Sequence, residues 1–235
     1  VTLLAKRIME PKPTTKPAIC IPRDIMLRAA MIRLGDIDEE VQAGYDVIRK
    51  YHKTVTVFGS ARVKEDNPYY QSARDISAKL AENDYAIITG GGHGIMEAAN
   101  RGAQEAGGDS VGFNIKLPKE QTLNQYTTDS LAFKYFAPRK ICMTLFADAY
   151  VFFPGGFGTL DELTEIITLI QTGKTTKAPA ILYGSDFWQG FDGFVQEELL
   201  RNGLITDGDD DLYHITDDVD EIVRLVKANH TYCEH

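Results

Sequence analysis

Apolar runs, four of which end in glycine, recur along the chain, and stretches with helical periodicity separate them. The runs cover residues 54–59, 85–92, 110–115, 149–156 and 178–184, and a shorter one covers residues 213–216. Helices are expected between them, near residues 68–82, 96–103, 159–171 and 187–200, with one that opens at Pro138 and a last one near 218–228. Apolar strands that alternate with helices are typical of a parallel sheet covered on both faces. The sequence therefore predicts an α/β, Rossmann-like, doubly wound parallel sheet.

The start of the chain has a different character. Four prolines interrupt residues 1–22, which predicts a loose lead-in. Helical spacing then runs through residues 23–51, with Asp36 as a candidate cap, which predicts two short helices that pack on the main domain or on a partner subunit. We therefore expect an N-terminal extension, residues 1–51, before a nucleotide-binding domain, residues 52–235.

Composition restricts the class of protein. Hydrophobic residues make up 43% of the 235 residues, enough for a sizeable buried core, so a mainly disordered chain is excluded. The net charge of −9 disfavours broad attraction to nucleic acid or to an anionic membrane. No apolar run approaches the length of about 18 residues that a membrane span needs, and the first residues do not resemble a secretory signal.

The cysteines support the same interpretation. Cys20, Cys142 and Cys233 are odd in number, far apart and without a Cys-x-x-Cys pair. This pattern favours a reducing compartment over a disulfide framework or a zinc site. A cytoplasmic protein with no metal is the expectation.

Glycines cluster at the ends of three expected strands. Residues 59–62 read Gly-Ser-Ala-Arg, residues 89–94 read Thr-Gly-Gly-Gly-His-Gly, and residues 154–159 read Pro-Gly-Gly-Phe-Gly-Thr. The carboxyl ends of parallel strands share one edge of the sheet, where ligands of this fold class bind. Glycine can also serve only to permit tight turns. Three such loops on one edge, two of them leading into helices, favour an anion site, most often for phosphate.

Two common phosphate-binding motifs do not fit. The dinucleotide fingerprint needs a third glycine where Ile95 stands and an acidic residue after the third strand, where Lys116 stands, so NAD is disfavoured. The triplet Gly173-Lys174-Thr175 resembles the end of a Walker A motif, but Thr168 replaces its first glycine and the triplet follows a helix. We therefore do not interpret it as a P-loop.

Two charged residues complete the predicted site. Arg139 opens the helix after the third strand, and Glu162 lies in the first turn of the helix after the fourth, so both lie at the ligand edge. An arginine there can bind phosphate with two hydrogen bonds. The alternative for Glu162 is a capping box, in which its carboxylate bonds back to Thr159 at the helix start. Spacing alone leaves both interpretations open.

In combination these motifs resemble the Lonely Guy (LOG) family. The resemblance covers roughly residues 54–184 and is carried by GGGHGIMEAA, PRK and PGGFGTLDE. Members of that family are nucleoside 5′-monophosphate phosphoribohydrolases, often labelled lysine decarboxylases. The resemblance implies that Arg139 and Glu162 are catalytic and that no cofactor is needed. It places the following residues at the nucleotide: Lys140, Gly155, Gly156, Phe157, Gly158, Thr159, Asp161, Thr168, Gly90, Gly91, Gly92, Gly94 and Ser60.

Several points stay open within this resemblance. Plant-type members usually carry Gly-Leu-Met-Gly where Gly94-Ile95-Met96-Glu97 stands, and the N-terminal helices are similar to those of the longer bacterial type, which forms larger assemblies. The preferred base, the number of subunits in the expected homo-oligomer, and any ligand contact by His93, Glu97 or Arg62 are therefore undecided.

The expected substrate is a nucleoside monophosphate, either N6-modified adenosine monophosphate or AMP itself. Hydrolysis of its N-glycosidic bond passes through an oxocarbenium-like state that a carboxylate can stabilise. A stress-nucleotide-regulated purine nucleosidase and a non-catalytic binder of nucleotide or molybdenum cofactor are the alternatives. Lysine decarboxylation is disfavoured, because no motif presents a lysine suited to a Schiff base.

Overall fold

The computed structural model describes residues 21–117 and 122–229. The chain divides into two compact units between Asp36 and Ile37, and each unit is described by itself. Residues 1–20 of the expected lead-in, which include Cys20, lie outside the described residues, and so does Cys233.

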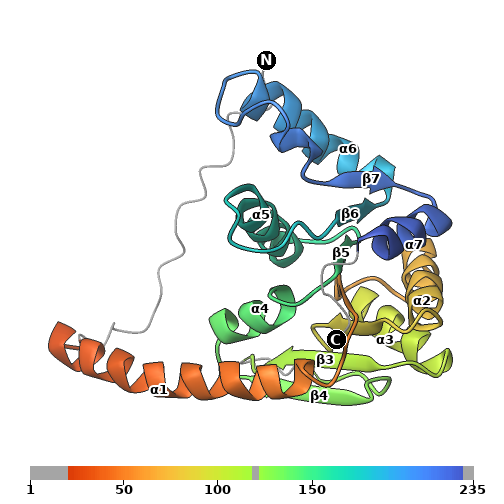
Figure 1. The fold of residues 1–235 in the computed structure, drawn as a ribbon. Helices are drawn as coiled ribbons and strands as arrows, with labels where there is room; N and C mark the ends of the chain where they lie inside the picture. The colour runs from red at the N-terminus through yellow and green to blue at the C-terminus, as the bar shows by residue number, and fades with distance from the viewer. Residues whose placement is uncertain (1–20, 118–121, 230–235) are drawn as a thin grey trace. The chain divides into compact units, whose positions relative to one another are not determined.

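The described residues form one parallel sheet, as predicted, with seven strands where the sequence indicated six (Figure 1). The order in space is β4-β3-β2-β1-β5-β6-β7, so the chain builds outward from β1 in one direction, returns, and continues from β5 in the other. The point at which the order reverses lies between β1 and β5, where this fold class binds ligands. The strands are β1 (Thr54–Phe58), β2 (Ala86–Thr89), β3 (Ser110–Ile115), β4 (Asp129–Phe133), β5 (Ala149–Phe152), β6 (Ala180–Tyr183) and β7 (His214–Thr216).

Helices cover both faces of this sheet and connect most of its strands. Alternate strand residues face two separate hydrophobic clusters: Val55 and Val57 belong to one, whereas Phe58 and Phe152 belong to the other and stack on each other. The helices are α1 (Arg23–Ile48), α2 (Pro68–Ala81), α3 (Ile95–Glu105), α4 (Phe136–Thr144), α5 (Phe157–Gln171), α6 (Ser185–Phe194), a π-helical turn (Val195–Leu200), a 3₁₀ turn (Asp209–Asp211) and α7 (Val219–Ala228).

Two expectations about these elements were wrong. Residues 23–48 form a single helix, α1, rather than two short ones. The capping preference of Asp36, worth about 1 kcal/mol, does not outweigh continuous helical hydrogen bonds. Strand β4 lies between the expected strands at residues 110–115 and 149–156, in a segment for which we predicted no strand. Its residues alternate between partly buried and exposed positions up to the buried Phe133, and none is β-branched. Pairing with β3 rather than local propensity therefore makes it a strand.

The closest helix packing is found between α2 and α3. A Cβ atom on Gly102 would overlap the backbone carbonyl of Arg74 on α2. Glycine is required there because the two backbones leave no space for a methyl group. By contrast, a Cβ atom on Gly190 of α6 would meet no neighbouring atom, so this glycine is not required by packing.

We expect Gly102→Ala to lower the free energy of unfolding by about 1–3 kcal/mol, because one helix must shift to relieve the overlap. Gly190→Ala should instead stabilise the protein by about 0.5–1 kcal/mol through its better helix propensity. Urea denaturation of both variants measures the difference. Equal midpoints for the two variants would contradict the proposed packing.

Candidate active site

The three glycine-rich loops meet at the carboxyl edge of the sheet, as predicted. The backbone N–H of Ser60, after β1, donates to the carbonyl of Pro154, after β5, at 3.1 Å. The N–H of Ile95, at the start of α3, donates to the carbonyl of Ser60 at 3.1 Å. Gly94 has a φ of 66° and no room for a side chain against the Ser60 carbonyl. The loop after β1 is thus bonded to both of the others.

Arg139 is buried at this edge. Its side chain is 8% exposed, and its Nε donates to the carbonyl of Phe113 on β3 at 2.7 Å. A Cβ atom on Gly90 would overlap its Nη2 atom, so the turn after β2 must carry glycine there to admit the guanidinium. Burial lowers the pKa of Arg139 from its ordinary value, whereas the nearby charge of Glu162 raises it.

Glu162 faces this guanidinium from the first turns of α5. Its Oε1 lies 3.5 Å from Nη1 of Arg139, and its side chain is 16% exposed. Burial raises the pKa of Glu162 to about 7, although the charges of Arg139 and Lys140 lower it. A carboxyl group that titrates near neutral pH can exchange protons under ordinary conditions.

The capping-box interpretation of Glu162 does not agree with the structure. Helix α5 begins at Phe157 with Gly156 as its N-cap, two residues earlier than expected. Thr159 therefore lies inside the first turn, and the cap makes no side-chain hydrogen bond. The Glu162 carboxylate is directed to Arg139 instead.

The helix start itself is formed by glycine. Gly155 packs so closely on Thr159 that a Cβ atom would overlap its hydroxyl, while Gly156 and Gly158 have open space around them. Phe157 between them is 92% exposed. Unsatisfied backbone N–H groups at such a helix start attract anions.

Lys140 does not face the glycine loops as an uncompensated cation. Its Nζ lies 2.9 Å from Oδ2 of Asp161 and 2.8 Å from Oε2 of Glu165, both on α5. Burial lowers the pKa of Lys140, but the hydrogen bonds to Glu165 and Asp161 leave that pKa above its ordinary value. Lys140 therefore ties α4 to α5 beside Glu162.

Thr168 is separated from this cluster. It lies six residues beyond Glu162, about 9 Å along the helix axis at 1.5 Å per residue, and its hydroxyl donates to the carbonyl of Thr164. Within one chain, α5 thus keeps Thr168 away from Arg139 and Glu162.

His93 lies on the outer side of the glycine turn after β2. Its Nδ1 lies 2.8 Å from Oε2 of Glu97, and its Nε2 lies 2.9 Å from the hydroxyl of Thr122. Both ring nitrogens are therefore engaged with other side chains. Ser60 accepts a hydrogen bond from the N–H of Arg62, which shapes the turn after β1.

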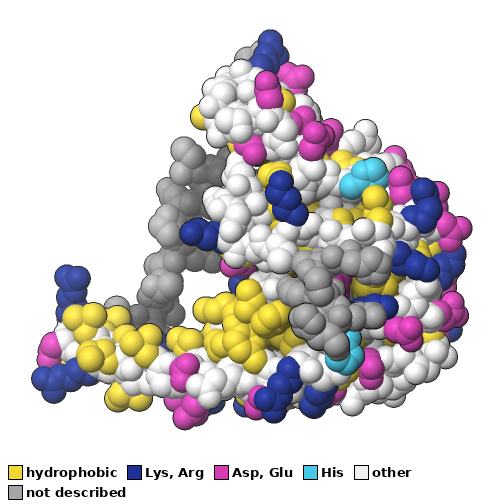
Figure 2. All heavy atoms as spheres, in the orientation of Figure 1, with side chains coloured by type: hydrophobic (Ala, Val, Ile, Leu, Met, Phe, Trp, Pro, Cys, Tyr) yellow, Lys and Arg dark blue, Asp and Glu magenta, His cyan; other side chains and the backbone are white. Residues whose placement is uncertain are grey.

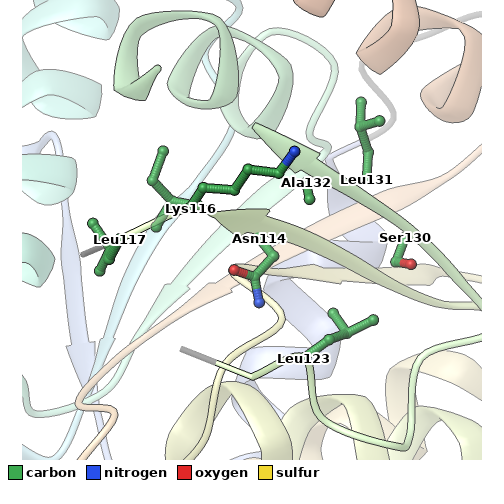
Figure 3. A pocket seen from close by; sticks show the side chains of 8 residues that line it. Asn114, Lys116, Leu117, Leu123, Ser130, Leu131 and Ala132 are labelled. Carbon is green, nitrogen blue, oxygen red and sulfur yellow. The ribbon is translucent and has the colours of Figure 1, made fainter. Parts of the chain in front are cut away.

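A cavity of about 450 Å³ opens beside the ends of β3 and β4 (Figure 3). Leu123, one of its lining residues, packs over Gly91 and Gly112 and so connects the cavity wall to the glycine turn. The lining is mostly apolar, with one amide, one hydroxyl and one ammonium group. It consists of Asn114, Ile115, Lys116, Leu117, Leu123, Ser130, Leu131 and Ala132.

Sequence reasoning missed three parts of this edge: the cavity, Glu165 as a partner of Lys140, and Asn124. Asn124 is buried and bonded to the turn at Gly91 and Gly92. A signal for it existed in Asn100, which stands among the alanines of α3 and is fully buried. A buried amide needs partners, and Asn124 is one of them.

Comparisons with known proteins agree with this architecture. A family model described as "Possible lysine decarboxylase" matches residues 96–226. The cytokinin riboside 5′-monophosphate phosphoribohydrolase LOG of Oryza sativa subsp. japonica is 30% identical over 164 residues, which cover 65% of this chain and 67% of that protein. The cytokinin riboside 5′-monophosphate phosphoribohydrolase of Mycobacterium marinum is 29% identical over 153 residues, 63% of this chain and 80% of that protein.

Solved structures share the fold. The X-ray structure of TM1055 superposes with a TM-score of 0.57 at 26% identity, covering 75% of this chain and 99% of that one. The molybdenum cofactor carrier protein of Chlamydomonas reinhardtii gives a TM-score of 0.55 at 21% identity, covering 77% and 99%. At that identity the second likeness shows the fold alone.

We expect Glu162 to titrate near pH 7, and Arg139→Met to raise its pKa further, because the substitution removes the cation that favours the carboxylate. The ¹³C shift of the labelled glutamate carboxyl group against pH measures both values. Lys50→Met, which removes a surface cation paired with Asp129, is the control and should leave the titration unchanged. Titration of Glu162 near its ordinary pKa would rule out its burial.

Proposed function

The chain belongs to the LOG family, and we propose that it hydrolyses the N-glycosidic bond of nucleoside 5′-monophosphates. The products are a free base and ribose 5-phosphate. The observation that carries this proposal is the buried pair of Arg139 and Glu162, held 3.5 Å apart beside the glycine loops. A protein that only bound the nucleotide would gain nothing from a buried carboxylate in a site for an anion.

In the proposed reaction Glu162 acts at the sugar. Its carboxylate stabilises positive charge on C1′ and takes a proton from the attacking water. The bond between C1′ and the base nitrogen breaks, and the base leaves with the electron pair and takes a proton from solvent, to which Glu162 later returns the proton that it accepted. Because only the ionised form can accept a proton, the pKa of about 7 leaves roughly half of Glu162 active at neutral pH.

The phosphate is assigned to the start of α5 in this proposal. The N–H groups of the segment Gly155–Thr159 and the dipole of α5 favour a dianion there, and Arg139 adds a fixed positive charge. Binding energy from the phosphate would then position the sugar against Glu162. Lys140, with Asp161, maintains the spacing of α4 and α5, and Gly90–Gly94 with Ser60 form the opposite wall.

The family description suggests lysine decarboxylation, which the site disfavours. A lysine that forms a Schiff base must lose its proton to act as a nucleophile. Lys140 lies beside Glu162, and its two carboxylate partners keep it protonated.

The finer assignment concerns the base. We propose a cytokinin-activating role, in which an apolar N6 substituent reaches the cavity beside β3 and β4. Its leucines offer an apolar surface that unmodified adenine does not need. A higher kcat/KM for isopentenyl-AMP than for AMP would support this assignment, and the reverse order would favour an AMP nucleosidase.

We expect wild-type protein to release base and ribose 5-phosphate from AMP or isopentenyl-AMP. Glu162→Gln should lower kcat by at least about 10²-fold, and the wild-type rate should rise with pH through about 7 as the carboxylate forms. Chromatography of the reaction mixtures measures both. Thr164→Val on the exposed side of α5 is the control. Bound but intact nucleotide with wild-type protein would point instead to a carrier or sensor.

We also propose a cytoplasmic homo-oligomer. No helix among the described residues is long and apolar enough to cross a membrane. Exposed apolar side chains gather on the first part of α1 and on α4 (Figure 2). In α1, Met31 is 71% and Ile32 is 74% exposed; in α4, Phe136 is 56% exposed. Such surfaces typically become buried in assemblies.

Charge favours a second copy of this chain as the partner. Residues 1–36 carry seven basic and three acidic side chains, whereas residues 37–235 carry 18 basic and 31 acidic ones. The N-terminal segment of one copy is therefore attracted to the main body of another.

We expect the wild-type chain to form a dimer or an assembly of dimers, and Met31→Glu with Ile32→Glu to shift it towards monomer by placing charge in the interface. Light scattering during gel filtration measures the mass. Leu204→Glu, at a position 70% exposed outside both surfaces, is the control. An unchanged mass for the double variant would exclude the first part of α1 from the interface.

A further inference from the structure

The glycine turn after β2 is held from outside by one residue, through both its backbone and its side chain. Asn124 is 4% exposed, and its backbone N–H donates to the carbonyl of Gly91 at 2.9 Å. Its side-chain Nδ2 donates to the carbonyl of Gly92 at 3.0 Å. Two consecutive carbonyls of the turn are thus pulled towards the same residue.

Asn124 is itself fixed by a buried polar network. Its Nδ2 also donates to Oδ1 of Asn100 at 2.9 Å, and Asn100 in turn bonds to Thr89 and Ser110. The hydroxyl of Thr89 accepts the N–H of Gly91 at 2.9 Å. The network therefore anchors the turn to β2, β3 and α3 together.

This anchoring determines the direction in which the backbone N–H of Gly92 points. In a trans peptide the N–H points opposite to the preceding carbonyl, and the described residues contain no cis peptide. With the Gly91 carbonyl turned to Asn124, the N–H of Gly92 points the other way. Gly92 is buried, and its N–H has no hydrogen-bond partner among the described residues.

A buried N–H without a partner is costly, at about 1–3 kcal/mol, unless a ligand or water accepts it. The neighbouring residue of the turn, Gly90, lies directly against the guanidinium of Arg139. The free donor is therefore at the edge of the sheet where Arg139 and Glu162 lie.

We infer that Asn124 is a positioning residue that fixes the N–H of Gly92 as a donor to an oxygen of the bound nucleotide. The identity of the ligand rests on the proposed function, whereas the donor and its anchoring do not. Asn124 touches no ligand in this assignment. It acts through the orientation of two peptide groups.

Two substitutions separate this role from simple support of the loop. Asn124→Ala removes all side-chain bonds. Asn124→Asp keeps the oxygen that accepts the N–H of Tyr126 at 3.0 Å, and so keeps the local turn, but loses the donor to Gly92 and Asn100. Asn83→Ala is the matched control, because Asn83 also donates to a backbone carbonyl, that of Lys79, at the end of α2.

Calorimetry with AMP on the Glu162→Gln background measures affinity without turnover. Both Asn124 substitutions should weaken the Kd for AMP at least tenfold, and Asn83→Ala should leave it within twofold. The affinity of the Asn124→Asp variant should recover partly as pH falls, because a protonated carboxyl group can donate again. In the otherwise wild-type enzyme the same substitutions should raise KM at least tenfold and change kcat less than threefold.

Failure of the inference and failure of the proposed function give different results. Unchanged AMP affinity in both Asn124 variants, with cooperative thermal unfolding retained, would overturn the inference whatever the activity. Absence of turnover in the wild-type protein would overturn only the hydrolase, because the calorimetric comparison does not depend on it. A lowered kcat with unchanged KM would assign Asn124 to structural support and also contradict the inference.

Discussion

The burial of one arginine governs the arrangement of this site. An arginine side chain with 8% exposure must have its donors satisfied by fixed groups, because water is excluded. The carbonyl of Phe113 supplies one acceptor and is accessible because β3 extends beyond the end of β2. Gly90 is needed because the guanidinium occupies the space of a side chain. Burial of the Arg139 guanidinium thus requires both the length of β3 and a glycine at position 90.

The same burial gives Glu162 its chemistry. A carboxyl group in a site with 16% exposure loses hydration, which favours its neutral form, whereas Arg139 and Lys140 favour the charged form. Lys140 is partly neutralised by Asp161 and Glu165, so it provides less compensation than a lone lysine would. Together these effects give the Glu162 carboxyl group a pKa of about 7. Replacing either acidic partner would alter this balance without touching the glycine loops.

Much of this arrangement could be predicted from the sequence, and the exceptions have physical reasons. Strands with continuous apolar runs, such as Ala149–Phe152, were evident because a buried strand shows itself by composition. Strand β4 was missed because an edge strand with alternating exposure owes its existence to its neighbour. The start of α5 was placed two residues late because Thr159 resembles a cap, whereas the chain uses Gly156. Local preferences failed where a contact distant in sequence decides the structure.

In the site, too, some residues could be predicted from the sequence and others could not. Arg139 and Glu162 could be paired in advance because the topology brings the starts of α4 and α5 to one edge. Asn124 could not, because it lies in a loop whose path no periodic pattern describes. Its role is inferred from the hydrogen bonds of the turn. The carbonyls of Gly91 and Gly92 both accept from Asn124, and an N–H in a trans peptide points opposite to the preceding carbonyl, so the turn presents an N–H on its other side. Glycine permits many conformations of such a turn, and a buried amide selects one of them. If the turn binds the nucleotide as we infer, the residues that select its conformation belong to the site alongside those that touch the ligand.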